Sequence, residues 1–265
     1  MRQFKALALC CAALLLVWPN APVRAQGCIL ARQCAANLGG LGSPYLAPGE
    51  WQFDSTLRWL DAWRHYNGQV EQVQRALLHN NVVNRQRLLE LGGDYGVTDR
   101  LAVSLGIPVL LHGSWSLPIP TGNPPTPLGP RYTQNSWGIG DITLNARYWL
   151  LSPSRNMKQN ISLGVGIQAP TGDPDVKSNF PDLTGKNIAL RSVDPSIQPG
   201  LGAWAFPVDL RAFKEIGNCT LYTSGTYLIT PTNVNGTLSP ISNLKGSLSP
   251  GQLYQKYDSV PDQYI

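Results

Sequence analysis

The stretch that decides the fold, LLELGGDYGVTDRLAVSLGIPVLL, runs from Leu88 to Leu111. Apolar residues alternate with small or polar residues on both sides of the segment 97–100, which reads Val-Thr-Asp-Arg. Successive side chains of a strand point to opposite faces, so this period of two around a short polar segment predicts a β-hairpin. In the second strand the apolar stripe is backed by Ala102, Ser104, Gly106 and Pro108. Such a strand suits a sheet with lipid or a core on one face and a crowded or wet interior on the other.

The N-terminus has the pattern of a secretory signal peptide. Arg2 and Lys5 precede an apolar run at 6–17, and Val23-Arg24-Ala25 resembles a cleavage site. We therefore expect export with residues 1–25 removed; a single anchor helix is the weaker alternative, because the run is too short to span a bilayer. Removing this segment takes away three basic residues and no acidic one, so the formal net charge falls from +5 to +2. No Lys/Arg cluster remains, and we expect no nucleic-acid partner.

The mature chain keeps three cysteines. Cys28 and Cys34 could form a disulfide in an oxidising compartment, which leaves Cys219 as the odd thiol. Because no histidine spacing accompanies them, we expect no metal site and no cofactor. The segment 200–205 matches G-x-G-x-x-A, yet it does not open a helix after a strand, so dinucleotide binding is not expected.

The remaining chain divides into an N-terminal segment at 26–49, expected to lie in the periplasm, and a strand-rich region at 50–265. Alternating stretches predict seven strands and the start of an eighth, near 51–59, 88–96, 101–111, 137–150, 161–168, 196–210, 219–230 and 260–265. The segment 112–136 is predicted to be a loop, because it is rich in proline and proline donates no ladder hydrogen bond.

The linkers between these strands alternate in length. The segments 66–87, 112–136, 170–195 and 231–258 are long, whereas 96–100, 152–160 and 212–218 are short. Bacterial outer-membrane barrels have this asymmetry, with short periplasmic turns and long outer loops. The sequence therefore predicts an all-β fold, an antiparallel up-and-down transmembrane β-barrel.

Aromatic residues support this topology. If the N-terminal side is periplasmic, the periplasmic strand ends carry Trp51, Tyr95, Tyr148 and Trp149, and the outer ends carry Trp63 and Trp137. Two such belts are what the two bilayer interfaces favour. The alternative is a set of aromatic residues that caps a soluble core.

Six charged residues share the inward parity of the predicted strands. They are Asp54, Arg58, Glu90, Asp94, Asp141 and Arg147. One interpretation is a lumenal ladder that shapes a pathway. The other, which we favour, is a salt-bridged network that stiffens the barrel wall, because wet ion pairs commonly fill barrels.

A hydrolase is the enzymatic alternative, because Ser114 and Ser116 lie near His112. The chain has no G-x-S-x-G elbow, and no carboxylate is evidently placed to orient the histidine. We therefore expect no enzyme and treat the histidines as loop residues.

Three motifs carry a resemblance to a known family. They are Tyr95-Gly96-Val97-Thr98-Asp99-Arg100-Leu101, then Gly138-Ile139-Gly140-Asp141-Ile142 with Arg147-Tyr148, and Ala169-Pro170-Thr171-Gly172-Asp173. In these the sequence resembles the outer-membrane β-barrel transporter family associated with the meta-pathway of phenol degradation. That family is similar in architecture to barrels that take hydrophobic, often aromatic, compounds into Gram-negative bacteria. The resemblance covers about 50–262.

The resemblance implies an outer-membrane channel or transporter for passive uptake of small hydrophobic or aromatic compounds. Its partners would be the outer-membrane lipid and that substrate, and the oligomeric state stays open. Structural roles at turns are implied for Tyr95, Gly96, Asp99, Arg100, Gly140, Asp141, Pro170, Thr171, Gly172 and Asp173. The alternatives are a structural or adhesive outer-membrane barrel, an outer-membrane hydrolase, and a secreted lipocalin-like binder.

The chain departs from the family pattern at its C-terminus. Such barrels usually continue to a strand that closes against the first, whereas seven strands and the start of an eighth do not close a bacterial single-chain barrel, which needs an even count. We therefore expect a barrel that is incomplete at the C-terminus, either truncated or completed by another chain.

Overall fold

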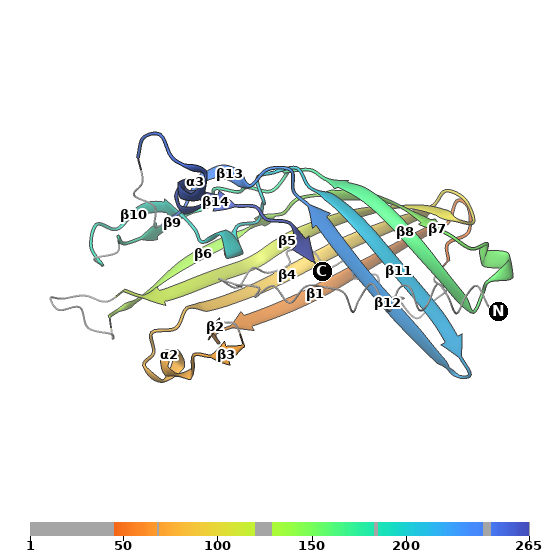
Figure 1. The fold of residues 1–265 in the computed structure, drawn as a ribbon, viewed down its shortest axis with the longest axis horizontal. Coiled ribbons are helices and arrows are strands. Elements are labelled where there is room, and N and C mark those ends of the chain that lie inside the picture. Colours follow the sequence, from red (N-terminus) through yellow and green to blue (C-terminus); the bar gives the residue numbers. More distant parts are fainter. Residues whose placement is uncertain (1–44, 68, 120–128, 183–184, 241–244, 265) are drawn as a thin grey trace.

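The computed structural model describes residues 45–67, 69–119, 129–182, 185–240 and 245–264. Its main body is one nine-stranded antiparallel sheet, curled into an open half barrel (Figure 1). The predicted signal peptide, nearly all of the segment 26–49 and the cysteines Cys28 and Cys34 lie outside the described residues. Among the described residues no helix is long and apolar enough to cross a membrane.

The strands of this sheet follow one another in chain order. Across the sheet they are β1 (Trp51–Ala62), β4 (Val83–Gly96), β5 (Leu101–Pro118), β7 (Thr143–Trp149), β8 (Gln159–Gln168), β11 (Phe206–Ile216), β12 (Cys219–Ile229) and β15 (Gln263–Tyr264). The ninth strand, β6 (Arg131–Ile139), pairs with one part of β5 while β7 pairs with the other, so β6 and β7 form one interrupted strand. Counted in this way, the sheet has seven strands and the start of an eighth. The predicted up-and-down antiparallel fold is confirmed, and the sheet is open.

Short and long connections lie at opposite ends of the sheet (Figure 1). We call the end with the tight β4–β5 and β11–β12 connections the turn end and the opposite end the loop end. The turn end also carries η1 (Pro153–Arg155). The loop end carries β2 (Tyr66–Asn67), β3 (Val70–Glu71), α2 (Val73–Leu77), β9 (Lys177–Phe180), β10 (Ala189–Ser192), η2 (Pro195–Ile197), β13 (Val234–Leu238), α3 (Pro250–Lys256) and β14 (Tyr257–Ser259).

The two faces of the sheet differ in polarity. Exposure alternates along all of β1, as a period-two strand requires. The convex face presents large apolar side chains that are exposed on seven strands: Phe53, Leu91, Leu105, Leu144, Leu163, Leu210 and Leu221. The concave face carries buried polar side chains, among them Asp94 and Asp209. The convex face is thus largely apolar, whereas the concave face holds the buried charged side chains of the sheet.

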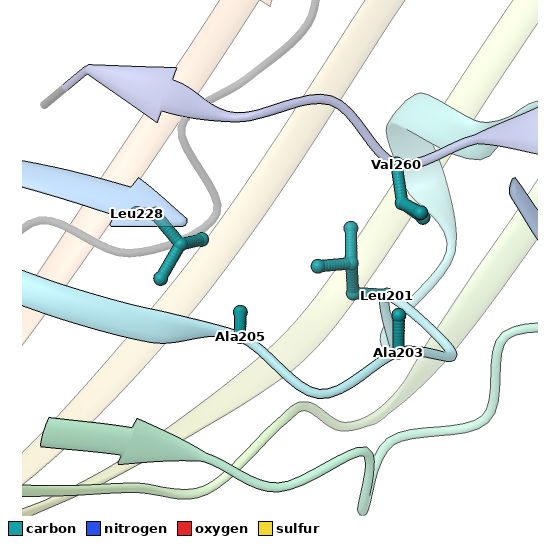
Figure 2. Packing of buried hydrophobic residues seen from close by; sticks show 5 residues of the cluster. All are labelled: Leu201, Ala203, Ala205, Leu228 and Val260. Carbon is teal, nitrogen blue, oxygen red and sulfur yellow. The ribbon is translucent and has the colours of Figure 1, made fainter. Parts of the chain in front are cut away.

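A small apolar core lies at the loop end. Figure 2 shows its members, Leu201, Ala203, Ala205, Leu228 and Val260, which come from the segment before β11, the end of β12 and the segment after β14. Val260 N donates a hydrogen bond of 3.0 Å to Asn233 O, which holds the third of these segments against the start of β13.

Two predictions about strands were wrong. The segment 112–136 is largely strand, because β5 continues to Pro118 and β6 begins at Arg131. Pro118 is compatible with this pairing, because it stands at the end of β5, opposite the first residue of β6. The strand expected near 196–210 is shifted: residues 195–197 form η2, and β11 runs from Phe206 to Ile216.

Candidate functional site

Seven charged side chains lie across the middle of the concave face, and we call them the charged belt. They are Asp54 and Arg58 on β1, Glu90 and Asp94 on β4, Arg147 on β7, and Asp209 and Arg211 on β11.

Ion pairs and hydrogen bonds connect the charged belt across strands. Arg58 Nη2 lies 3.2 Å from Glu90 Oε1 on the neighbouring strand. Arg147 Nη2 lies 3.4 Å from Asp94 Oδ1, although β5 separates their strands. Ser104 on β5 fills the gap by donating a hydrogen bond to the same Asp94 oxygen. The belt therefore ties together strands that are not direct neighbours in the sheet.

The second half of the belt is centred on Asp209. Its carboxylate accepts hydrogen bonds from Asn145 Nδ2 and, at 2.6 Å, from Thr226 Oγ1. Arg211 interacts electrostatically with Asp209 and Arg147, and also with Asp54 on the far side of the sheet. This electrostatic interaction between β11 and β1 reflects the curl of the sheet, because four strands lie between them in the sheet order.

Glycines on the concave face make room for these side chains. A Cβ atom at Gly92 would collide with the Asp54 carboxylate, and one at Gly164 would lie 3.1 Å from Asp209 Oδ2. Glycine at these two positions thus leaves the space that the neighbouring carboxylates occupy.

The structure places five of the six predicted inward residues, Asp54, Arg58, Glu90, Asp94 and Arg147, in the charged belt. The sixth, Asp141, lies apart from it at the loop end. Arg211 was missed because the strand that carries it was predicted to end at residue 210, and Asp209, inside that strand, was not singled out. The alternation of Val208-Asp209-Leu210-Arg211-Ala212 was the signal that could have found them.

Asp141 organises a junction of three chain segments, 140–142, 171–173 and 200–201, which we call the Asp141 junction. Its carboxylate is 3% exposed and accepts hydrogen bonds from Gly172 N at 2.9 Å and Leu201 N at 2.6 Å. Gln168 Nε2 donates a third, at 3.2 Å. Because the donors come from the segments after β8 and before β11, this one side chain fixes both against the end of β6.

Threonine and glycine complete the Asp141 junction. Thr171 Oγ1 accepts from Ile142 N at 2.9 Å and donates to Gly140 O at 3.0 Å. Gly172 packs backbone to backbone on Gly200, so that a Cβ at Gly172 would lie 2.6 Å from Gly200 Cα.

Most of the second and third family-motif residues therefore meet at one place, the loop end. Gly140, Asp141, Thr171 and Gly172 take part directly, and Asp173 O accepts a bond of 3.0 Å from Gly200 N. Pro170 lies in the same turn, bridged by the 2.8 Å bond from Thr171 N to Ala169 O.

The first motif lies at the turn end instead. Gly96 N donates to Glu50 O at 2.9 Å, and the Tyr95 ring lies 4.7 Å from the Trp51 ring. Arg100 Nη1 donates to the Tyr148 hydroxyl at 3.3 Å, whereas Asp99 is exposed in the turn. Most motif residues thus mark the two ends of the sheet, whereas Arg147 of the second motif belongs to the charged belt.

An aromatic cluster closes the concave side at the turn end. The rings of Tyr45, Trp149 and Phe213 lie 5.0 to 5.8 Å apart. Trp149 is 7% exposed, so its predicted place in an exposed aromatic belt was wrong: it shares the concave parity of Arg147. Burial raises the pKa of the Tyr45 hydroxyl above its ordinary value, and the hydrogen bond from Asn160 acts in the opposite direction.

The loop end of the concave side is filled by residues 192–199, which we call the inserted segment. Val193 and Ile197 in it are fully buried. Asn84 Nδ2 and Gln86 Nε2 of β4 donate to Ser196 Oγ and Ser196 O, both at 2.6 Å.

From β6, Gln134 Oε1 accepts from Asp194 N at 2.8 Å, and Ser136 Oγ donates to Ile197 O at 2.5 Å. A cavity of about 20 Å³, room for one water molecule, remains between the inserted segment and the rest of the concave face. It is lined by Gln86, Leu88, Leu110, Asp141, Gln168 and Gln198, among others.

The residues weighed for a hydrolase lie elsewhere. His112 and Ser114 point to the convex side of β5, opposite Arg87 and Arg85 of β4. Cys219 is an exposed free thiol at the start of β12. Within the described part of the chain, no group of three or more His, Cys, Asp or Glu side chains is arranged to hold a metal ion.

Comparison with known proteins bears on these motifs. No curated protein matches the chain. The family model described as "Putative MetA-pathway of phenol degradation" matches residues 86–203, which run from β4 to the segment before β11 and contain all three motifs. The expected resemblance to that family is confirmed, and the match points to a role related to the metabolism of aromatic compounds.

Proposed function

We propose that this chain is a bacterial outer-membrane protein whose convex face contacts lipid and whose concave face lines a passage for passive uptake of small hydrophobic or aromatic compounds, without catalysing a reaction. The observation that carries the proposal is the inverted polarity of the sheet. Each of the seven strands exposes a large apolar side chain on the convex face, which is a phenylalanine on β1 and a leucine on the other six, while the charged belt lies on the concave face. Water-soluble proteins rarely expose apolar surface on this scale, whereas a barrel in lipid requires it.

The height of the apolar band fits a bilayer. On β1 the convex face carries no charged side chain from Trp51 until Asp61, which lies ten residues further along the strand. At about 3.3 Å per residue this is about 33 Å along the strand, or about 25 Å at a tilt of about 40°. Exposed Trp51 at the turn end and Trp137 at the loop end bound the band, where bilayer interfaces favour tryptophan.

The open edges of the sheet impose a condition on this proposal. Among the described residues β1 pairs only with β4, and β12 pairs with β15 over two residues. Unpaired backbone groups cost several kcal/mol each in hydrocarbon. The proposal therefore requires further strands, of the same polypeptide or of another chain, to pair with β1 and β12 in the membrane.

The choice of cargo rests on the family match at 86–203. Beside the inserted segment, Leu88 and Leu110 are buried and the adjoining cavity has room for one water molecule. The proposal therefore requires the inserted segment to move when a solute passes.

Two adjacent residues of β1 test the orientation. Ser55 lies on the convex face and Thr56 on the concave face. We expect Thr56→Cys, in membranes, to react with a water-soluble maleimide above the background of the parent protein, and Ser55→Cys to stay at that background. Equal labelling of both would contradict insertion with this face toward lipid. Recovery of the protein in the soluble periplasm would favour a lipocalin-like binder instead.

Two adjacent residues of β5 test the passage. Ser104→Trp places a bulky side chain in the concave space beside Asp94, whereas Leu105→Trp places the same side chain on the convex face. In a strain lacking the chromosomal gene, the parent and Leu105→Trp proteins should restore uptake of radiolabelled phenol or toluene at low concentration, and Ser104→Trp should not. Uptake that does not change on deleting the gene would refute the transport function.

A further inference from the structure

A basic patch lies on the convex face at the loop end. Strand pairing sets it in two rows, because Trp59 pairs with Arg87 and Arg87 with His112, while Asp61 pairs with Arg85 and Arg85 with Ser114. Trp137 of β6 borders the first row, since it lies between the residues that pair with Leu110 and Gly113. Below these rows a third, made of Leu57, Leu89, Val109 and Ile139, is wholly apolar.

Charged side chains on the convex face of the described sheet lie at its two ends. Among the described residues of the large sheet, the charged side chains at convex positions are Asp61, Arg85, Arg87 and Arg131 at the loop end and Lys214 at the turn end. The band between them is apolar or small. Three of the four loop-end charges are basic, so this rim has a net positive charge.

Internal ion pairing satisfies little of this charge. Arg85 Nε lies 3.4 Å from Asp61 Oδ2, but both side chains are more than half exposed, and such surface pairs are weak. Arg87 is exposed between Trp59 and His112. Arg85 and Arg131 are close enough for their positive charges to repel each other.

A hollow adjoins the patch on the side away from the apolar band. It has a volume of about 530 Å³ and is lined by Asp61, Trp63, His79, Arg85 and Arg131, with parts of the segment that follows α2. Arg131 fixes one wall, because Nη2 donates to His79 O at 3.1 Å and to Asn81 O at 3.0 Å. The hollow is open to the surface and large enough for a sugar-sized headgroup.

We propose that this patch binds the phosphorylated headgroup of a glycolipid in the outer leaflet. Phosphate oxygens would bridge Arg85 and Arg87, the sugar would occupy the hollow, and the acyl chains would run over the apolar row between Trp59 and Trp137. Charge-assisted bonds from guanidinium groups suit phosphate, and tryptophan suits the interface between headgroup and hydrocarbon. This inference rests on the proposed insertion in the outer membrane, with the loop end facing outward.

The test uses the full chain in detergent with three probes: radiolabelled lipid A with both phosphates, the same lipid without phosphates, and inorganic phosphate as competitor. We expect the double variant Arg85→Gln/Arg87→Gln to bind phosphorylated lipid A at least tenfold more weakly than the parent. Lys214→Gln, the matched removal of a convex-face charge at the turn end, should bind like the parent, and Arg85→Lys/Arg87→Lys should recover part of the affinity. The dephosphorylated lipid should bind weakly to all of them.

Three outcomes would overturn the proposal: equal binding of the two lipids, no loss in the glutamine double variant, or displacement of the lipid by inorganic phosphate at the concentration expected of a simple anion site. Membrane partition of the same variants, measured in parallel, separates this inference from the proposed function. If the variants partition into the outer membrane but substituting Arg85 and Arg87 leaves lipid binding unchanged, only the inference fails. If the parent protein does not partition into the membrane, both fail.

Discussion

Replacing Asp141 by asparagine should lower the free energy of unfolding by about 3 kcal/mol. The substitution keeps the shape of the side chain and removes its charge and one of its two acceptor oxygens. In the structure one oxygen accepts from Gly172 N and the other from Leu201 N and Gln168 Nε2. An asparagine can therefore keep the bond to one backbone N–H, while its NH₂ group faces the other.

The magnitude follows from which of these bonds can be recovered. Gln168 Oε1 has no hydrogen-bond partner among the described residues, so rotation of this amide would let it accept from the new NH₂ group. In either orientation of the asparagine amide, one backbone N–H, that of Gly172 or that of Leu201, loses its acceptor. Losing a hydrogen bond to a charged acceptor costs about 1.5–3 kcal/mol, and a buried unsatisfied donor adds about 1–3 kcal/mol, so we take about 3 kcal/mol as the sum after relaxation.

The measurement is a urea titration of the protein folded into lipid vesicles, followed by tryptophan fluorescence. The matched control is Asp173→Asn in the neighbouring motif, because that exposed side chain accepts a local bond from Asp175 N, which asparagine can also accept. Asp141→Asn should shift the midpoint to lower urea, Asp141→Ala should shift it further, and the control should not shift it. If Asp141→Asn unfolds at the midpoint of the control, the Asp141 junction does not hold the loop end as argued.

Three further changes give separate tests. Gly200→Ala should prevent the close contact with Gly172, because the added Cβ would collide with the Gly172 carbonyl. Protease cleavage of the loop end should therefore accelerate, and an unchanged cleavage rate would contradict this reasoning. Arg147→Met should destabilise the fold by about 3 kcal/mol in the urea titration by removing the buried ion pair with Asp94, and Arg147→Met/Asp94→Leu should recover most of the loss; no recovery would mean that packing dominates. Burial raises the pKa of Tyr45 in the folded state. The contribution of this group to the free energy of unfolding is therefore fully present below the ordinary tyrosine pKa of about 10 and is lost as the pH rises through the higher pKa of the folded state. At high pH the parent protein should accordingly unfold at a lower urea concentration, and the urea midpoint should depend less on pH in Tyr45→Phe.

The alternation of the chain predicts which face each side chain of the first two strands takes, although β4 begins earlier than predicted. On β1 and β4 the side-chain parity assigns Asp54, Arg58, Glu90 and Asp94 to one face, and the structure places all four on the concave face. This works because a sheet with one apolar face leaves a strand little freedom to slip: a shift by one residue would exchange the two faces.

Local pattern fails where a strand is interrupted or a loop folds inward. Between β6 and β7 the segment 140–142 leaves the ladder to form the Asp141 junction, whose donors lie about 30 and 60 residues away along the chain. The inserted segment depends likewise on Asn84 and Gln134, which read in sequence as ordinary polar residues of a wet face. Neither arrangement has a signature within a window of ten residues, because the bonding partners are distant in sequence.

The contact between Gly172 and Gly200 has an evolutionary consequence. In most packed pairs a larger residue on one side can be accommodated by a smaller one on the other. Here each glycine meets backbone atoms of its partner rather than a side chain, so no replacement at one position can relieve a change at the other. Sequences that keep this contact should therefore carry glycine at both positions together, and lineages that lose one should lose the other and rebuild the connection between β8 and β11.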